Sequence, residues 1–314
     1  MKHQVHASNL VETPEGLICA FFRGTREGEN DVGIYLTRNV KGDSVTNSRR
    51  IADGNGKPCW NPVLFQVEPR QLLLWFQVGI FQKWTGMMKR STDNGKTWSE
   101  ADPLPDRFLG PIRNKPILLP DGRLLCPSST EVPDWRIHFE LYDDAYGSWQ
   151  KIEVHHQDGF DSIQPTLLLW PDGHIQALCR TCNGVIATCR STDGGWTWTP
   201  LVDAGLPNPN SAIDAIMLRD GRALLVYNHA GLYEHQRRLR SMKPSGPRTP
   251  LNVAISEDGK SWQQIATLED DRTPSEMGRP PEFSYPSVIQ TQDGKVHVTY
   301  TWRRQRIAHK IIEV

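Results

Sequence analysis

A nine-residue motif that occurs twice, 100 positions apart, constrains the fold of this chain most strongly. RSTDNGKTW at 90–98 and RSTDGGWTW at 190–198 are nearly the same, SEDGKSW at 256–262 is a shortened copy, and YDDAYGSW ends a degenerate copy at Trp149. The Asp side chain can accept hydrogen bonds from the backbone of its own turn, and Gly supplies the positive φ that such a turn needs. The Trp folds back over an apolar surface. We interpret the motif as a structural staple of a β-hairpin rather than as a catalytic motif.

Short strand-like runs also flank tight turns along the whole chain. The turns and the runs that follow them read PEGLICAFF, PDGRLLCP, PDGHIQALC, RDGRALLVY and QDGKVHVTY. Two short strands around a tight turn predict a β-hairpin. The hairpins define about six units of roughly 50 residues, a period typical of propeller blades. The sequence therefore predicts an all-β fold, a six-bladed β-propeller that forms a single domain over residues 1–314.

Composition argues against several classes of partner. Lys plus Arg equals Asp plus Glu at 36 each, so no overall field attracts nucleic acid or a membrane surface. No apolar run approaches the roughly 18 residues that cross a bilayer. The segment MKHQVHASNLVET lacks the apolar stretch of a signal peptide, which predicts a cytoplasmic protein, although a secreted protein whose signal had been removed would look the same. The six cysteines are expected to be buried thiols, and the sequence contains no cofactor motif and no complete metal-ligand pattern.

Polar residues accumulate where the predicted strands begin or end. A propeller gathers the innermost strand of every blade around one axis, so such residues converge on one mouth although they are far apart in sequence. The polar positions at predicted strand starts and ends are His6, Arg26, Glu27, Asp31, Trp60, Asn61, Arg113, Asn114, Lys115, Glu131, Gln164, Arg180, Asn210, Asp214, Asn228, His229, Arg248, Glu282, Tyr285 and Arg304. Several arginines without a phosphate-cradling glycine loop indicate a carboxylate ligand that is held bidentately. The expected partner is therefore an acidic glycan.

Five of these polar residues are expected to contact the substrate in addition to the arginines discussed below. They are Asn61, Arg113, Lys115, Asn210 and Asp214. Trp60 and Trp84 could stack on a sugar ring, but packing in the core is an equally good interpretation of these two residues.

Four segments of the chain resemble segments of the sialidase superfamily, the six-bladed propellers that carry this motif. PSVIQTQDGKVHVTY after Tyr285 is similar to the segment with the nucleophilic tyrosine, and IQPTLLLWPDGHIQALCR is similar to the segment with a glutamate and the second arginine. RTPLNVAISEDGKSW resembles the segment with the third arginine. The first blade, which includes FFRGTREGEND, resembles the sialidase blade with the first arginine and the acid/base aspartate.

The resemblance covers essentially the whole chain and implies roles for individual residues. Tyr285 matches the nucleophile, and Arg180 and Arg248 match two arginines that bind the sugar carboxylate. Two further positions follow from the first blade: Arg26 matches an arginine near the sugar, and Asp31 falls near the acid/base position, for which Glu27 competes. In sialidases a neighbouring glutamate helps the tyrosine to attack the anomeric carbon.

The sequence departs from the sialidase pattern at three positions. The glutamate position is Gln164, which cannot take a proton, and the first-arginine position is His6. In TYTWRR the side chains of Tyr300, Trp302 and Arg304 are expected to alternate onto one face of a strand. Arg304 would then supply the missing guanidinium, and His6, which titrates near neutrality, becomes a candidate acid or base.

Three functions remain open from the sequence. The first is an exo-acting glycosidase, sialidase-like in binding, that acts on a terminal carboxylated sugar such as sialic acid or a uronic acid. The second is a uronate-directed lyase in which His6 or Tyr285 removes a proton, because related propellers that cut rhamnose–glucuronate linkages are similar in using a histidine. The third is a non-catalytic carbohydrate-binding propeller, which the loss of the glutamate at Gln164 favours.

Overall fold

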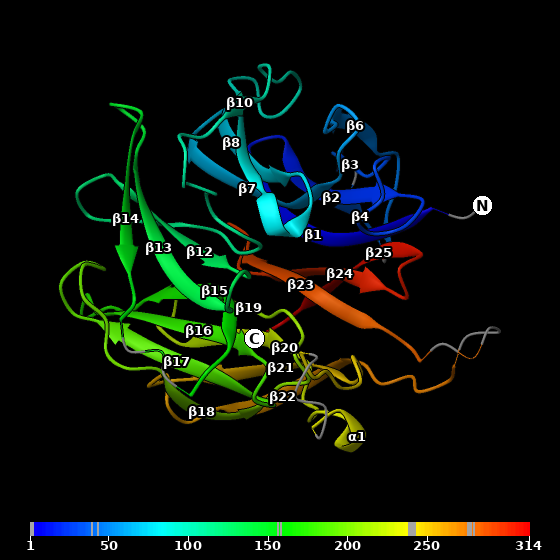
Figure 1. Cartoon of the computed structure of the whole chain (residues 1–314), viewed down its shortest axis with the longest axis vertical. Coiled ribbons are helices and arrows are strands. Elements are labelled where there is room, and N and C mark those ends of the chain that lie inside the picture. The colour runs from blue at the N-terminus through cyan, green and yellow to red at the C-terminus, as the bar shows by residue number, and fades with distance from the viewer. Residues whose placement is uncertain are drawn as a thin grey trace.

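Six antiparallel sheets follow one another around a central axis in the computed structural model of the chain (Figure 1). The structure describes residues 3–38, 40–42, 44–155, 157, 159–237, 243–274, 278 and 280–314. Five of the sheets have four strands and the sixth has five. This arrangement confirms the predicted all-β, six-bladed propeller.

The strands of each blade are consecutive in sequence, as expected for hairpin-built blades. From the axis outward, the first three blades contain β1 (Gln4–Thr13), β2 (Gly16–Gly24), β3 (Gly33–Thr37) and β6 (Arg49–Ala52); β7 (Cys59–Glu68), β8 (Gln71–Val78), β9 (Thr85–Ser91) and β10 (Asp102–Pro103); and β11 (Ile117–Leu118), β12 (Leu124–Thr130), β13 (Arg136–Asp143) and β14 (Ser148–Glu153). The last three contain β15 (Ser162–Leu169), β16 (Ile175–Thr181), β17 (Val185–Ser191) and β18 (Val202–Pro207); β19 (Asp214–Met217), β20 (Ala223–Tyr227), β21 (Leu251–Ser256) and β22 (Gln263–Glu269); and β23 (Phe283–Gln290), β24 (Val296–Trp302) and β25 (Arg306–Ile312). Short helices η1 (Phe81–Lys83) and α1 (Glu234–Arg237) lie in connections.

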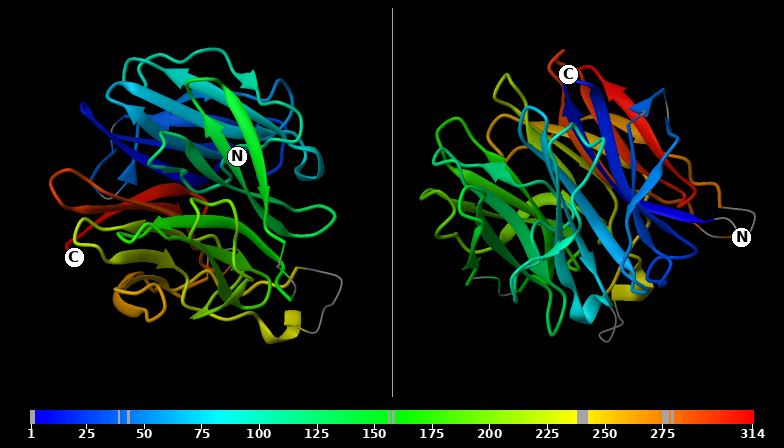
Figure 2. Two further views of the ribbon diagram at one scale, coloured as in Figure 1. Left: turned by 90° about the vertical axis from the view of Figure 1, so that its left-hand side faces the viewer. Right: turned by 90° about the horizontal axis from the view of Figure 1, so that it is seen from above.

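A loop of the first blade closes the ring. Strands β4 (Val40–Lys41) and β5 (Ser44–Val45) leave the first blade between β3 and β6 and extend the sheet of the last blade, where Ser44 pairs with Ala308 of β25. The blue first blade and the red last blade accordingly lie side by side in both views of Figure 2. Backbone hydrogen bonds thus join the first blade to the last and cover the edge that β25 would otherwise expose.

The repeated motif is structural, as predicted. The Asp93 carboxylate accepts hydrogen bonds from the backbone N–H of Thr97 at 2.8 Å and from its hydroxyl at 2.6 Å, and Asp193 makes the same pair of bonds with Thr197. Trp198 stacks on Phe139 with ring centroids 4.0 Å apart. Each motif therefore fastens the outer hairpin of its own blade and contributes no group to the mouth of the propeller.

A repeated backbone irregularity lies where the innermost strands begin. Strand pairing shifts register in β1, β7, β15 and β23, as expected for β-bulges. At these places, and just ahead of β11 and β19, a non-glycine residue adopts a positive φ: Ala7 (57°), Asn61 (40°), Gln164 (53°), Tyr285 (54°), Arg113 (74°) and Asn210 (59°). L-residues rarely adopt this conformation, and strain of this kind clusters at functional sites. These irregularities change the direction in which the side chains around the propeller axis point.

Other expectations from composition concern cysteines, metals and membranes. All six cysteines are buried free thiols, as predicted. Within the residues that the structure describes, no group of three or more His, Cys, Asp or Glu side chains is placed to hold a metal ion. In the same part of the chain, no helix is long and apolar enough to cross a membrane.

Candidate active site

A cavity of about 180 Å³ opens where the innermost strands begin. It is lined by Glu27, Trp60, Asn61, Trp84, Glu131, Ile163, Gln164, Arg180 and Tyr285. Five of these side chains were predicted as site residues from the sequence: Glu27, Asn61, Gln164, Arg180 and Tyr285. They come from four different blades, so the propeller axis brings together groups that are distant in sequence.

Tyr285 lies at the centre of a cluster of guanidinium groups. Arg180 donates through Nη1 to the Tyr285 phenol oxygen at 2.8 Å and to Gln164 Oε1 at 3.2 Å, and its Nε donates to Asn210 Oδ1 at 2.6 Å. The guanidinium carbon of Arg248 lies 5.4 Å from the centre of the Tyr285 ring. Nη2 of Arg180 has no partner among the described residues, so it is available to an anionic ligand. The positive charge also stabilises negative charge that develops on the phenol oxygen.

Glu282 links the arginines at the edge of the site. Its carboxylate accepts from Arg248 Nη1 at 2.7 Å and from Arg304 Nε at 3.0 Å, and Arg304 Nη1 donates to Glu27 at 2.5 Å. Burial alone would raise the pKa of Glu282, but the two guanidinium groups outweigh it and hold that pKa well below its usual value. For Arg248 burial opposes the charged form, yet Glu282 and Tyr285 prevail and its pKa is raised. Glu282 is therefore an ionised carboxylate that orients both arginines.

The structure corrects the predicted strand alternation around Arg304. Tyr300 and Trp302 lie on β24, but the strand ends at Trp302, and Arg303 and Arg304 adopt φ values of 50° and 59° in the turn before β25. Arg304 therefore does not share a strand face with Tyr300. The left-handed turn instead directs its side chain to Glu282 and Glu27.

His6 supports Tyr285 from behind and does not line the cavity. Its ring is fully buried with its centroid 4.0 Å from that of Tyr285, and its Nδ1 lies 2.8 Å from the Thr301 hydroxyl. Burial, followed by the charge of Arg304, holds the pKa of His6 well below its usual value. Its Nε2 has no hydrogen-bond partner in the described part of the chain. His6 is a neutral imidazole at neutral pH that cannot touch a ligand in the cavity directly.

Two residues predicted from the first blade lie outside the cavity. The Arg26 side chain is 71% exposed and pairs with Glu29 at 2.5 Å. Asp31 is exposed, and its carboxylate accepts from the backbone N–H of Thr25 at 2.8 Å and from its hydroxyl at 2.6 Å. Both side chains stabilise the loop after β2 rather than face Tyr285. The structure therefore does not place Arg26 beside the expected sugar site or Asp31 at the expected acid/base position.

Three further predicted residues lie along the axis behind Tyr285. Arg113 is completely buried; it donates to the carbonyl oxygens of Ser8 at 3.0 Å and of Pro286, and its guanidinium lies 5.4 Å from the Tyr285 ring. Lys115 and Asp214 lie further along the same axis and line a different cavity. The structure therefore does not place Lys115 and Asp214 in the cavity at Tyr285 where a contact with the ligand was expected, and the left-handed backbone at Arg113 (φ 74°) interrupts the regular alternation of side chains just before Lys115.

Two further groups at the cavity had no specific role assigned from the sequence, although Glu131 was named there among the polar positions at strand ends. Glu131, which follows β12, lines the cavity, and burial raises the pKa of its carboxyl group. Trp135 packs its ring 5.3 Å from the Arg180 guanidinium. The polar position of Glu131 at a strand end was a usable signal, as was the place of Glu282 three residues before Tyr285, whereas nothing in the sequence distinguished Trp135 from the other tryptophans.

The site as a whole combines three kinds of group around one small cavity. Arg180 supplies positive charge in the cavity, and Arg248, which is not one of the lining residues, lies against the Tyr285 ring. Tyr285 supplies a hydroxyl that already accepts a charge-assisted hydrogen bond, and Glu27 and Glu131 supply carboxyl groups. Cations of this kind bind a carboxylate, and a phenol beside carboxyl groups can act as a nucleophile or a base.

Comparisons with known proteins agree with the propeller fold. Residues 15–298 match the family model described as BNR repeat-like domain. The chain is 24% identical over 302 residues to the anhydrosialidase of Macrobdella decora, a match that covers 87% of this chain and 36% of that relative, so the chain spans about a third of the relative's length. Among solved structures it is similar to a Dyadobacter fermentans protein of unknown function (TM-score 0.78, 20% identity, 100% of this chain and 95% of that one) and to Trypanosoma rangeli sialidase (TM-score 0.74, 12% identity, 99% and 55%). The chain belongs to the BNR repeat-like domain family, with sialidases among its distant relatives.

Proposed function

We propose that this chain is a glycosidase that removes a terminal carboxylated sugar, sialic acid or a uronic acid, from an acidic glycan. One observation carries the proposal: Arg180 and Arg248 both lie against Tyr285, and Arg180 donates to its phenol oxygen at 2.8 Å inside a cavity. The arginines would hold the sugar carboxylate, and the phenol would then lie beside the anomeric carbon.

The residues of the cavity support a mechanism with a covalent intermediate. Tyr285 attacks the anomeric carbon and passes its proton to Glu27, whose carboxylate is salt-bridged to Arg304. The glycosidic bond breaks, and Glu131 donates a proton to the departing oxygen. Water then attacks the anomeric carbon of the glycosyl–tyrosine, with Glu131 now acting as base. The bond to the tyrosine oxygen breaks, the free sugar is released, and Glu27 returns its proton to restore the phenol. Gln164 accepts a hydrogen bond from Arg180 and holds it in place but takes no proton.

The size of the cavity favours action at the end of a glycan. Its volume of about 180 Å³ lies below the range of about 300–1,000 Å³ that is typical of pockets for larger ligands. One terminal sugar residue fits such a space better than an internal stretch of polysaccharide, and Trp60 and Trp84 form one apolar side of it with ring centroids 5.7 Å apart.

Product analysis tests the proposal. The protein is incubated with sialosides, with glucuronate-terminated oligosaccharides and with oligosaccharides whose glucuronate carries a further sugar at O4. Products are followed by mass spectrometry and by the ultraviolet absorbance of an unsaturated uronate. We expect release of the intact acidic sugar with no rise in absorbance. Saturable binding without turnover of any of these glycans would contradict a glycosidase and leave a carbohydrate-binding propeller.

Elimination on a uronate is a second candidate, and Gln164 is the observation that favours it. With no glutamate at that position, Tyr285 could remove the C5 proton next to a carboxylate that the arginines neutralise. The C4–O glycosidic bond would break as the C4–C5 double bond forms, so the sugar on O4 of the uronate would be the leaving group. His6 is not the base in this scheme, because it is fully buried and does not line the cavity. A rise in ultraviolet absorbance with an oligosaccharide whose glucuronate carries a further sugar at O4 would select this reaction over hydrolysis.

Arg180→Ala and Arg248→Ala are each expected to weaken binding of the acidic sugar by about 1.5–3 kcal/mol, as for the loss of a hydrogen bond to a charged group. Calorimetric titration of each variant with the product sugar measures the change. Arg222→Ala is the matched control, since Arg222 pairs with Asp220 in an exposed turn and should bind as the wild type does. Unchanged affinity in both site variants would contradict carboxylate binding at Tyr285.

Glu131→Gln is expected to slow cleavage of natural glycosides by about a hundredfold or more, because general acid catalysis contributes about 10²–10⁴-fold. Aryl glycosides with good leaving groups should be affected far less. Burial raises the pKa of Glu131, so wild-type activity should fall as pH rises through that value, and the variant should lack this decline. The matched control is Asp134→Asn, an exposed neighbour. Equal losses on both substrate types would exclude Glu131 as the acid.

A further inference from the structure

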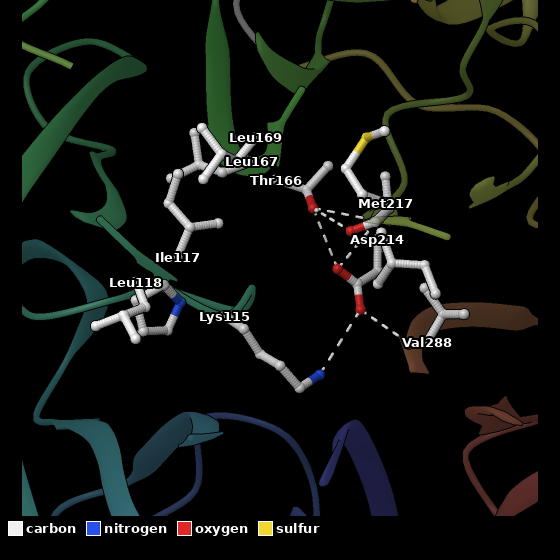
Figure 3. Close-up of a pocket in the computed structure, with 12 residues that line it drawn as sticks. Lys115, Ile117, Leu118, Thr166, Leu167, Leu169, Asp214, Met217 and Val288 are labelled. Atoms are coloured by element: carbon white, nitrogen blue, oxygen red, sulfur yellow. Dashed lines mark hydrogen bonds and ion pairs between the residues drawn. The ribbon is translucent and has the colours of Figure 1, made fainter. Parts of the chain in front are cut away.

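A second cavity, of about 310 Å³, lies on the propeller axis away from Tyr285 (Figure 3). Its walls include Leu167 and Leu169 of β15, Met217 of β19 and Val288 of β23. These residues belong to the C-terminal halves of the innermost strands, whereas the cavity at Tyr285 is lined by the beginnings of the same strands. Five residues of strand separate Gln164 from Leu169, a distance of roughly 16 Å at about 3.3 Å per residue. The two cavities therefore face opposite ends of the axis.

Two cations lie near the single carboxylate at the interior end of this cavity: Lys115 lines the cavity, and Arg113 lies outside its lining. The carboxylate of Asp214 interacts electrostatically with both Lys115 and Arg113. The other titratable group near Lys115 is the Cys19 thiol, and burial raises its pKa to about 12, so that it is neutral. Burial also lowers the pKa of Arg113, to about 10, which still leaves it charged at neutral pH. Two buried cations thus share one anion.

Asp214 forms only a long ion pair with Lys115. Its Oδ1 accepts from the Thr166 hydroxyl at 3.2 Å and from the backbone N–H of Ala215 at 3.1 Å, and its Oδ2 accepts from the N–H of Val288 at 2.9 Å. The Lys115 ammonium lies 4.0 Å from Oδ2, beyond hydrogen-bond distance. The carboxylate is therefore bound by neutral donors of the strands more closely than by Lys115.

The Lys115 ammonium has donors to spare. It donates to the Ser287 hydroxyl at 2.9 Å, and an ammonium group carries three donors. The side chain is 18% exposed and lines the cavity, so a ligand that enters the cavity can reach it. Burial lowers the pKa of Lys115, since a cation that lacks full compensation is costly in this environment. An anion bound at Nζ would remove that cost.

We propose that this cavity binds a small monocarboxylate with a branched or cyclic apolar body, with the carboxylate on Lys115 Nζ and the body between Leu118, Leu169 and Met217. One excess charge matches a monoanion rather than a phosphate dianion. Apolar side chains dominate the walls, as Figure 3 shows for Ile117 and Leu118 on one side and Leu167 and Leu169 on another. The volume reaches the lower end of the range for small-molecule pockets. The site is independent of the proposed glycosidase activity.

Calorimetric titration with 4-methylpentanoate tests this site in the full chain. We expect saturable binding of one molecule per chain, at least tenfold tighter than that of the neutral 4-methylpentanamide. Lys115→Met should reduce the affinity at least tenfold. Leu169→Trp, which fills the cavity and leaves its charges in place, should do the same and provides the test if the Lys115 variant does not fold.

The Arg180→Ala variant separates this site from the cavity at Tyr285. It should bind 4-methylpentanoate with wild-type affinity whether or not the chain proves to be a glycosidase. The proposal is overturned if the amide binds as tightly as the acid, if Leu169→Trp binds normally, or if Arg180→Ala loses binding. Tighter binding of inorganic phosphate than of the carboxylate would overturn the ligand class.

Discussion

Tyr285→Phe is expected to lower kcat by at least about a thousandfold while it leaves the affinity for the carboxylated sugar nearly unchanged. Phe keeps the ring that packs against the guanidinium groups of Arg180 and Arg248 but removes the hydroxyl that accepts from Arg180. The loss therefore removes the attacking atom and not the binding site. Rates measured with the glycan that the wild type cleaves, together with calorimetry, give the two quantities.

Tyr142→Phe is the matched control for this prediction. The Tyr142 hydroxyl donates to Asp144 at 2.8 Å and its ring stacks on Trp149 in the third blade, away from the cavity at Tyr285. It should leave turnover unchanged. Substantial activity in Tyr285→Phe would show that the phenol oxygen is not the nucleophile and would remove the covalent intermediate from the mechanism.

Glu282→Gln is expected to lower the free energy of unfolding by about 1.5–3 kcal/mol, the usual contribution of a hydrogen bond to a charged group, because the ion pair is only partly buried. Arg248 would lose the one carboxylate to which it donates in the described part of the chain, and Arg304 would keep only Glu27. Urea or thermal denaturation at neutral pH measures the change. Glu29→Gln, which disrupts the exposed pair with Arg26, should change stability by less than about 0.5 kcal/mol.

The same variant predicts a pH dependence with a definite sign. The pKa of Glu282 is depressed in the folded protein, so its contribution to stability is fully present above the unfolded carboxyl pKa of about 4.3 and is lost as pH falls through the folded value. The difference in stability between wild type and Glu282→Gln should therefore shrink under acid conditions. A difference that stays constant down to strongly acid pH would contradict an ionised Glu282 between two arginines.

The fold was predictable because its signals are local. The Asp93 and Asp193 turns and the tight turns between strand pairs each form within a few residues of chain. Their recurrence along the chain then indicates about six units. Tyr285, Arg180 and Arg248 followed from segments that resemble sialidase segments, and the structure brings these three side chains together.

The rest of the site could not be read from the sequence for physical reasons. Side-chain alternation assumes a regular strand, but left-handed residues such as Arg113 and Arg304 break that period. Lys115 therefore faces the opposite cavity, and Arg304 reaches Glu282 from a turn rather than from a strand. Asp31 has the charge and the sequence position expected of the acid/base group. Its carboxylate instead accepts hydrogen bonds from Thr25, which hold it in the loop after β2.

The most direct test of the central claim compares the affinity of the protein for a free acidic sugar with its affinity for the methyl ester. Sialic acid and glucuronic acid are each titrated beside their esters into the wild type and into Arg180→Ala. If arginines hold the carboxylate beside Tyr285, one of the acids should bind the wild type at least about tenfold, or about 1.4 kcal/mol, more tightly than its ester, and this preference should disappear in the variant. Equal affinities for acid and ester, or a preference that survives in Arg180→Ala, would contradict the account.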